Sequence, residues 1–229
     1  MSFKLFAPFF VAVALILAGC ATPTKMAFHK DTEAVTSTTK PVFLMTATLK
    51  NSYRPSYQPK VIVLNVEKEG VSQRGDRINF TMDDKAKNES DSPELANSYF
   101  FRMELEKGNY LLRGLTGFSG IFPVRGNFFA PLHAEMKSAV PGIFYLGHVN
   151  ATVRERIGNE FRAGLPIPLV DQAVTGFSGG TFDIEITDQF EIDVSEFRAR
   201  FPALREVVIQ KAILAPFDRA KAQQWWEAQ

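Results

Sequence analysis

A serine between glycines is the feature of this sequence whose residue types could most directly do chemistry. Residues 176–180 read Gly-Phe-Ser-Gly-Gly, which satisfies Gly-x-Ser-x-Gly, the pattern in which a serine on a sharp strand-to-helix turn attacks an acyl carbon. The acid and the histidine that assist such a serine follow it in the chain. Here His29, His133 and His148 all precede Ser178, and a strand-like run follows it. Order and context therefore exclude this hydrolase pattern.

A second serine mechanism fits the order of the residues but not their spacing. The same five residues resemble the Gly-Asp-Ser-Gly-Gly of trypsin-like proteases, in which the histidine does precede the serine. Phe177 replaces the aspartate, and His133 and His148 lie too few residues before Ser178 for two barrels to fit between them. We therefore predict that Ser178 does no covalent chemistry, and we assign no catalytic residue.

A repeated pentapeptide favours a structural interpretation of the same serine. Residues 116–120 and 175–179 both read Thr-Gly-Phe-Ser-Gly. Glycine, serine and an anchoring phenylalanine suit a turn or a bulge at the end of a strand. The two copies are either equivalent corners of one fold or the remnant of a duplication.

Metal and cofactor patterns are not found in the sequence. Neither His133 nor His148 has a second His or Cys within four residues, and the single carboxylate in that range is Glu135 beside His133, so we interpret both as strand-face histidines. The acidic run 83–91 lacks the residue order of a calcium loop. Asp183 and Glu185 alternate along a strand and indicate the solvent side of a sheet edge. We predict no metal site and no cofactor.

The single cysteine is the residue whose position points to a covalent modification. Lys4 precedes an apolar run from Leu5 to Leu17, and Ala18 and Gly19 lead into Cys20. A basic start, a short apolar core and small residues at its end are typical of a secretory signal, which is too short to span a bilayer permanently. We expect residues 1–19 to be this signal. An ordinary cleaved signal and an uncleaved anchor are the alternatives.

The segment 17–20, Leu-Ala-Gly-Cys, resembles the lipobox of bacterial lipoproteins. The resemblance implies that Cys20 is diacylated through a diacylglyceryl group on its sulfur, that the signal is cleaved before it, and that the new amine is acylated with a palmitate-type chain. Two or three acyl chains anchor a protein stably where one does not. Ala21, instead of aspartate, implies transfer to the outer membrane of a Gram-negative cell, most simply to its periplasmic face, with the surface-exposed leaflet left open. The membrane is thus an expected partner through Cys20.

Charge and cysteine content exclude other classes. The chain has 26 basic and 25 acidic side chains, and because Lys4 is the only charge in residues 1–19, the processed chain is formally neutral. Proteins that bind nucleic acids need a basic excess, so we expect no nucleic-acid partner. With one cysteine no internal disulfide can form, and 21 phenylalanines supply much of the expected core.

The remaining sequence predicts a mainly β fold. Residues 20–41 begin with the cysteine that the lipobox resemblance implies is acylated, and the Thr, Ser, Lys and Ala that follow it predict a flexible tether. A single domain over 42–229 then follows, an antiparallel β-sandwich with two short C-terminal helices. Strand-like runs cover 42–49, 61–66, 77–82, 99–105, 110–115, 129–136, 143–149, 181–186 and 207–214.

Turn residues and a change of period complete this prediction. Lys107, Gly108 and Asn109 predict one hairpin, and Pro141-Gly142 predicts a second, with Gly142 at positive φ. Residues 143–147 are expected to form a central strand buried on both faces. Cap-forming residues at Asp193 precede Val194, Phe197 and Phe201 at helical spacing, and a second helix is expected from Asp218 onward.

This layout is similar to the β-sandwich domains of uncharacterised proteobacterial lipoproteins. The similarity rests on residues 108–113, 141–147 and 193–204 and covers 42–215. It implies a fold, and it implies no chemistry.

Aromatic residues form the surface feature that stands out. Phe118, Phe122, Phe128 and Phe129 crowd a glycine-punctuated segment with Ile121, Pro123 and Arg125. A core strand with a bulge explains them, and so does an aromatic loop that contacts a partner or lipid. Trp225 and Trp226 diverge by about 100° on a helix, so one is expected to dock while the other faces outward.

These observations predict a membrane-anchored envelope lipoprotein that is not an enzyme and acts as a binding or structural module, with an envelope protein as its partner. The alternative is a hydrolase of envelope polymers whose catalytic residues are dispersed in the sequence. A cleft lined by His133 or His148 with acidic partners would favour the hydrolase, and an apolar surface patch on a filled sandwich would favour binding.

Overall fold

The fold is described from a computed structural model of the chain. It covers residues 22–28, 40–70, 77–90, 92–120, 123–166 and 172–228. Cys20 and Phe122 lie outside the described residues. Within these ranges no helix is long and apolar enough to cross a membrane.

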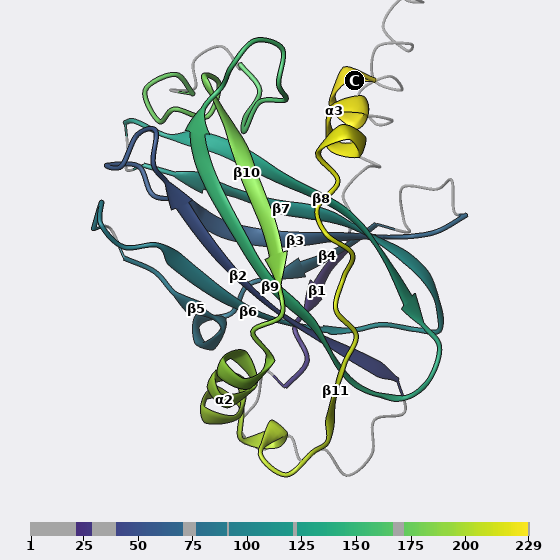
Figure 1. The fold of residues 1–229 in the computed structure, drawn as a ribbon. Helices are drawn as coiled ribbons and strands as arrows, with labels where there is room; N and C mark the ends of the chain where they lie inside the picture. The colour runs from purple at the N-terminus through teal and green to yellow at the C-terminus, as the bar shows by residue number, and fades with distance from the viewer. Residues whose placement is uncertain are drawn as a thin grey trace, which may run out of the picture.

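Two β-sheets pack face to face to form the body of the molecule (Figure 1). In chain order the elements are β1 (Thr22–Lys25), β2 (Pro41–Asn51), β3 (Lys60–Lys68), β4 (Arg77–Thr81), η2 (Asp84–Ala86), β5 (Lys87–Asn88), β6 (Asn97–Glu104), β7 (Gly108–Ser119), β8 (Gly126–Ser138), β9 (Gly142–Glu155), β10 (Gly180–Thr187), α2 (Phe190–Arg200), η3 (Pro202–Leu204), β11 (Ile209–Lys211) and α3 (Arg219–Glu227). Sheet A has the order β1-β4-β3-β7-β8, and sheet B has the order β10-β9-β2-β6-β5, with β11 paired to β9.

The predicted fold class is confirmed, since the chain is a mainly β sandwich with two short helices near its C-terminus. Most neighbouring strands are antiparallel. Three pairs are parallel: β1 with β4, β2 with β9, and β11 with β9. Parallel neighbours need a crossover connection, so these three pairs join segments that are distant in sequence.

Both predicted hairpins are wrong, because each turn carries the chain from one sheet to the other. The turn before Gly108 joins β6 of sheet B to β7 of sheet A, and the turn at Pro141-Gly142 joins β8 of sheet A to β9 of sheet B. An alternating strand looks the same in sequence whether its successor lies beside it or across the core, so the pattern did not distinguish them. Gly142 does have the expected positive φ, at 148°.

The main core fills the space between the sheets and is rich in aromatic rings. Phe101 of β6, Phe80 of β4 and Phe182 of β10 are fully buried there. A second apolar cluster lies on the other face of sheet B, where α2 and η3 cover Ile143 and Tyr145 of β9. Strand β9 is therefore covered on both faces at this point, as its sequence predicted.

Helix α2 confirms the predicted helical spacing but begins earlier than expected. Val194 and Phe197 are buried against sheet B, and Phe201 follows the helix at its C-terminal cap. The helix starts at Phe190, so Asp193 lies inside the first turn and is not a cap. Asp193 is 3% exposed. Its carboxylate points toward sheet B, where it contacts Tyr145 and His148 of β9.

The expected flexible tether is wrong for the part that the structure describes. Residues 22–28, which we call the N-terminal arm, belong to the sandwich. Strand β1 pairs with β4 from Thr22 opposite Ile78 to Lys25 opposite Thr81. Met26 is 2% exposed in the main core. A few apolar residues among polar ones were enough to dock this segment, because sheet A offered an unpaired edge.

Candidate functional site

An apolar pocket lies between strand β8, the segment 161–165 after β9, and helix α3. Its volume is about 290 Å³. Aromatic and aliphatic side chains form most of its wall: Phe129, Pro131, Phe161, Leu165, Trp225 and Trp226. Arg162 and Gln172 provide polar groups at the pocket. We call this hollow the α3 pocket.

Four of the six aromatic residues singled out in the sequence meet at this pocket. Phe128, Phe129, Trp225 and Trp226 all line it. The core-strand interpretation is confirmed for Phe128, which is 3% exposed and packs in the core. Phe129 on the same strand lines the pocket, and its contact with a partner or lipid stays a prediction. Phe118 is not among the lining residues.

Phe118 lies instead near the end of β7, where the guanidinium carbon of Arg125 is 4.1 Å from its ring centroid.

The two tryptophans dock on different parts of the sandwich. Trp225 lies against Phe129 and His133, with ring centroids 5.1 and 4.9 Å away. Trp226 packs against the main core. Both are half-buried, so the expectation that one would face outward is wrong, although the divergence of adjacent helical side chains is confirmed. Trp225 therefore packs helix α3 against the edge strand β8, and Trp226 packs it against the main core.

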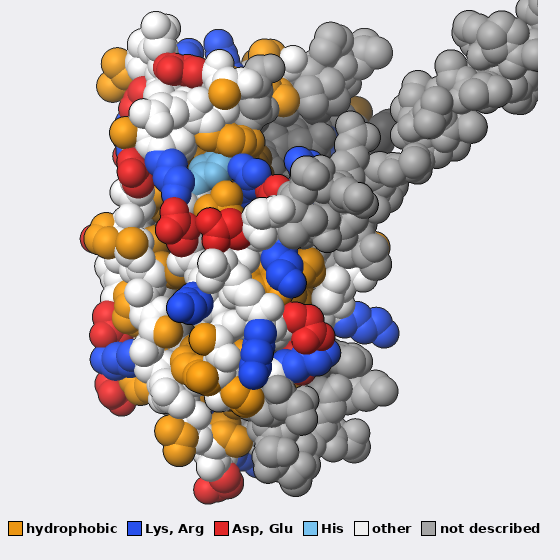
Figure 2. Space-filling model, turned by 90° about the vertical axis from the view of Figure 1, so that its right-hand side faces the viewer, with side chains coloured by type: hydrophobic (Ala, Val, Ile, Leu, Met, Phe, Trp, Pro, Cys, Tyr) orange, Lys and Arg blue, Asp and Glu red, His pale blue; other side chains and the backbone are white. Residues whose placement is uncertain are grey.

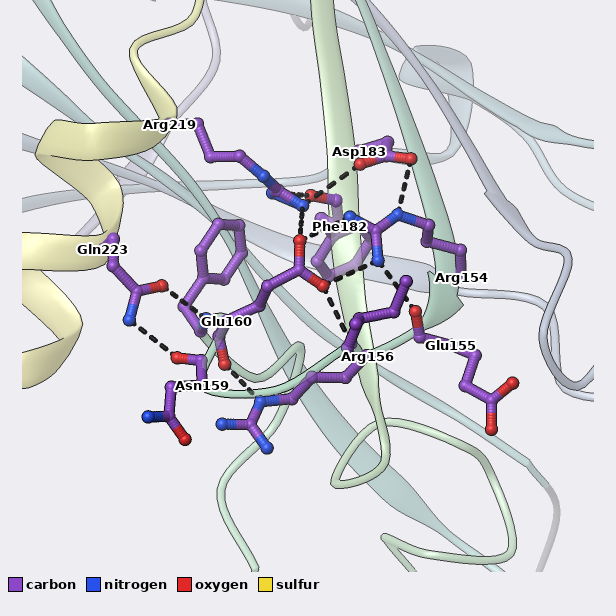
Figure 3. Close-up of polar contacts among 11 residues, drawn as sticks. Arg154, Glu155, Arg156, Asn159, Glu160, Phe182, Asp183, Arg219 and Gln223 are labelled. Carbon is purple, nitrogen blue, oxygen red and sulfur yellow. Dashed lines mark hydrogen bonds and ion pairs between the residues drawn. The ribbon is translucent and has the colours of Figure 1, made fainter.

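A network of ion pairs fixes the start of α3 beside sheet B (Figure 3). Arg154 of β9 donates two hydrogen bonds to Glu160, at 2.5 and 2.7 Å, and one to Asp183 of β10 at 2.8 Å. Arg219, the first residue of α3, bridges the same two carboxylates at 3.1 Å each. It also donates to the Phe182 carbonyl at 2.9 Å. Asp183 is exposed on the edge strand, as predicted from the sequence.

Glu160 is the centre of this network. Hydrogen bonds from Arg154, the amide of Ile157 and the charge of Arg219 lower the pKa of Glu160 to about 2. Gln223 adds a second attachment, since it accepts from the Phe161 amide at 2.7 Å and donates to the Asn159 carbonyl at 2.8 Å. The segment 159–161, which leads into the pocket wall, is therefore tied to α3 through both Arg219 and Gln223.

His133 lies beneath Trp225 in an unusual backbone conformation. Its φ is 47°, at a bulge where the pairing of β7 and β8 shifts register. The residue is 5% exposed, and its Nε2 has no hydrogen-bond partner among the residues described. Burial, with the nearby charges of Arg113 and Lys221, lowers the pKa of His133 to about 4. It is a neutral packing residue at pH 7, on a strand as predicted.

A second polar cluster, which the sequence did not predict, connects strands β2 and β9 of sheet B with helix α2. The carboxylate of Asp193 is 3.1 Å from His148 Nδ1, and His148 Nε2 is 2.9 Å from Thr48 Oγ1. Tyr145 donates to Asp193 at 2.6 Å. A carboxylate at Nδ1 places the ring proton there, so Nε2 accepts from the threonine hydroxyl. An acid, a histidine and a hydroxyl in a row are the arrangement used to activate a nucleophile.

The components of this cluster are buried to different degrees. His148 is 9% exposed and Asp193 is 3% exposed, while Thr48 of β2 is half-buried. His148 is not among the residues that line the α3 pocket. The expectation of a strand-face histidine is confirmed, but its acidic partner lies 45 residues away on α2. Local spacing rules gave no signal for a pair so far apart.

The repeated pentapeptides lie at strand ends, as predicted. The first ends β7, and the second lies in the turn that leads into β10. Their backbones differ, because positive φ occurs at the last glycine of the first copy, Gly120, and at the first glycine of the second, Gly176. The copies are therefore not equivalent corners. Ser178 lies in the turn, where its amide donates to the Gln172 carbonyl at 3.2 Å.

Across the described parts of the chain, no three His, Cys, Asp or Glu side chains gather where they could hold one metal ion. On the side of the molecule shown in Figure 2, hydrophobic, basic and acidic side chains are interspersed in small groups. Comparison of the chain with models of known protein families, with curated protein sequences and with solved structures found no match.

Proposed function

We propose that this protein is a lipid-anchored envelope lipoprotein, held in the outer membrane through Cys20, whose sandwich is a non-catalytic module that binds another envelope protein. The α3 pocket carries the proposal. Its wall of aromatic side chains with an arginine beside it has the composition of the buried centre of a protein interface.

The size of the pocket favours a protein side chain as its occupant. A volume of about 290 Å³ lies at the lower limit of small-molecule sites, which span about 300–1,000 Å³. It suits one or two apolar anchor residues of a partner. Because ion pairs hold α3 in place, the pocket is already formed before binding, and little ordering entropy is lost.

Leu165 offers a direct test of this binding site. It lines the pocket and is 50% exposed, so Leu165→Asp puts a charge at the pocket without disturbing the core. Leu95→Asp, at a position 55% exposed and away from the pocket, is the matched control. A photocrosslinker at Leu165 in intact cells identifies the candidate partner, and calorimetry with the purified partner then measures affinity. We expect Leu165→Asp to weaken binding at least about tenfold, or about 1.4 kcal/mol. Equal affinities for the two variants would contradict the proposal.

The anchor is tested separately at Cys20. Cys20→Ala should leave a precursor that is not processed at the lipoprotein site. Intact mass spectrometry of protein extracted from membranes should show a processed chain that carries acyl chains on Cys20. An unmodified cysteine would rule out the anchor but not the binding pocket.

One observation favours a second function, the hydrolysis of an envelope polymer. The row Asp193, His148, Thr48 supports Thr48 as a nucleophile with His148 as its base. A fluorophosphonate should then label Thr48 in the purified protein and fail to label Thr48→Val. Labelling of Ser178 instead would revive the serine mechanism. If neither residue is labelled, the row acts only to hold α2 on sheet B.

A further inference from the structure

The N-terminal arm is built into both sheets. Strand β1 extends sheet A along β4, and the Ala27 amide donates to the Arg102 carbonyl of sheet B at 2.9 Å. Met26, between these two attachments, is buried in the main core. The arm therefore has no freedom to act as a spacer.

Arg102 makes release of the arm costly. Its side chain is 0% exposed, and its Nε donates to the Ala27 carbonyl at 2.7 Å. The guanidinium also pairs with Asp83 and lies 3.9 Å from the ring centroid of Phe201. A buried cation needs its acceptors, so peeling the arm away would leave this guanidinium without one of its partners.

Only Ala21 separates Cys20 from Thr22, the first residue of β1. Two Cα–Cα steps of 3.8 Å span at most about 8 Å. A cysteine that carries acyl chains lies at the level of the lipid headgroups. From this geometry we infer that the β1 edge of sheet A rests directly on the phospholipid surface, with no spacer between anchor and fold. The inference rests on the lipidation of Cys20 proposed above.

The residues of this edge suit a lipid surface better than a second protein strand. Pro23 in the middle of β1 has no amide proton to donate, and the neighbouring Lys25 is exposed, two features that block pairing with another strand. Lys25 and the exposed Arg77 of β4 place two positive charges near Thr22. Basic groups are attracted to an anionic lipid surface. Carboxylates near this edge among the described residues have basic partners of their own: Glu67 of β3 is paired with Arg113 at 2.5 Å, and Asp83, which follows β4, is paired with Arg102.

The inference is tested with the processed full chain in vesicles of phosphatidylethanolamine and phosphatidylglycerol. Acylation consumes the thiol of Cys20, so a cysteine introduced elsewhere is the one free thiol. Lys25→Cys reports on the β1 edge. Val208→Cys, 79% exposed beside the strand that joins sheet B, is the matched control. Each is labelled with a fluorophore and quenched by lipids that carry a nitroxide on the headgroup.

We expect several-fold stronger quenching at position 25 than at position 208. A 20-residue Gly-Ser spacer between Ala21 and Thr22, which spans about 25 Å on average, should reduce quenching at position 25 to the level at 208. Equal quenching at both positions in an acylated chain would overturn this inference alone. Protection of position 25 from both lipid and aqueous quenchers would also overturn it, since a protein would then cover the edge. An unmodified Cys20 in the mass spectrum would overturn both the anchor and the inference.

Discussion

At the scale of single residues, the two described histidines have opposite environments. His148 is bound at both ring nitrogens, by Asp193 and Thr48, and so connects α2 to the middle of sheet B. His133 is enclosed by Trp225 with its Nε2 unpaired among the described residues. Both were predicted to be strand-face residues, because no second His or Cys lies within four residues of either. Their difference comes from what the fold brings to each ring.

His133 predicts a pH dependence of stability. The pKa of His133 is lowered from 6.5 to about 4 in the folded protein, chiefly by burial. Between these values the unfolded chain binds a proton that the folded chain does not, so stability falls as the pH drops from about 6.5 to about 4 and His133 contributes no further loss below that. We expect His133 to account for on the order of 1–3 kcal/mol of this loss.

The matched variant is His133→Asn, because asparagine tolerates positive φ and does not titrate. Urea unfolding of both proteins from pH 7 to pH 4 measures the effect. The stability difference between wild type and variant should change with pH across this window. A constant difference would show that His133 is protonated in the fold as easily as in the unfolded chain.

At the scale of elements, helix α3 depends on a few polar attachments. Its N-cap is Asp218, which accepts from the Lys221 amide at 3.0 Å, and Arg219 and Gln223 tie it to the ion-pair network and to segment 159–161. The α3 pocket exists only while the helix stays in this position. Ion pairs that are partly exposed contribute little to the free energy of unfolding. We therefore expect α3 to detach from the sandwich by local unfolding more readily than the sheets unfold.

Arg219→Gln tests this attachment. It removes the ion pairs with Glu160 and Asp183, and because these groups are partly exposed we expect a loss of about 1 kcal/mol. Faster amide exchange in α3 and a red shift of tryptophan emission should accompany it. Lys221→Gln, whose partner Glu135 is 83% exposed, should change neither signal. Unaltered exchange in Arg219→Gln would show that apolar packing alone holds the helix.

The turn between β8 and β9 predicts a second effect at this scale. Gly142 has φ 148°, and a Cβ there would lie 3.1 Å from the Phe144 ring. A β-branched side chain is strained in this region, so Gly142→Val should destabilise the protein by about 1 kcal/mol or more. Ala139→Val, exposed in the same turn, is the control. Urea unfolding that gives equal midpoints for the two variants would contradict the role of the glycine.

At the scale of the whole molecule, the N-terminal arm decides how the sandwich relates to its proposed anchor. With a free tether the domain would move independently of the membrane. With the arm docked, an anchor at Cys20 would be only two residues from sheet A, and this would restrict the orientation of the α3 pocket relative to the membrane. Strand β8, beside the pocket, and β1 are the two opposite edges of sheet A.

Met26 tests whether the arm belongs to the fold. Because Met26 is buried in the main core, Met26→Ala should destabilise the protein by about 2–5 kcal/mol. Lys25→Ala, exposed on the same arm, should change stability by less than about 0.5 kcal/mol. Thermal and urea unfolding measure both. A neutral Met26→Ala would mean that the arm does not contribute to the folded state.

The sequence by itself indicated most of the strands and both α-helices, because the apolar period along a segment is a local property. Strand β1 is an exception, since its residues were expected to belong to a tether. The strand-like run 61–66 predicted β3, and the spacing of Val194, Phe197 and Phe201 predicted α2, although the helix begins at Phe190. Phe128, Phe129, Trp225 and Trp226, which the sequence singled out as candidates for an interaction surface, line the α3 pocket.

Only the tertiary structure decided which segments meet. The chain after β6 crosses to the other sheet and does not form a hairpin, and the N-terminal arm pairs with the edge of sheet A. Both outcomes depend on the surfaces that distant parts of the chain present. The row Thr48, His148, Asp193 joins three elements in the same way. Local sequence patterns do not predict such partners. The period of apolar residues along a segment fixes which face of the element each side chain lies on, but not which other element covers that face.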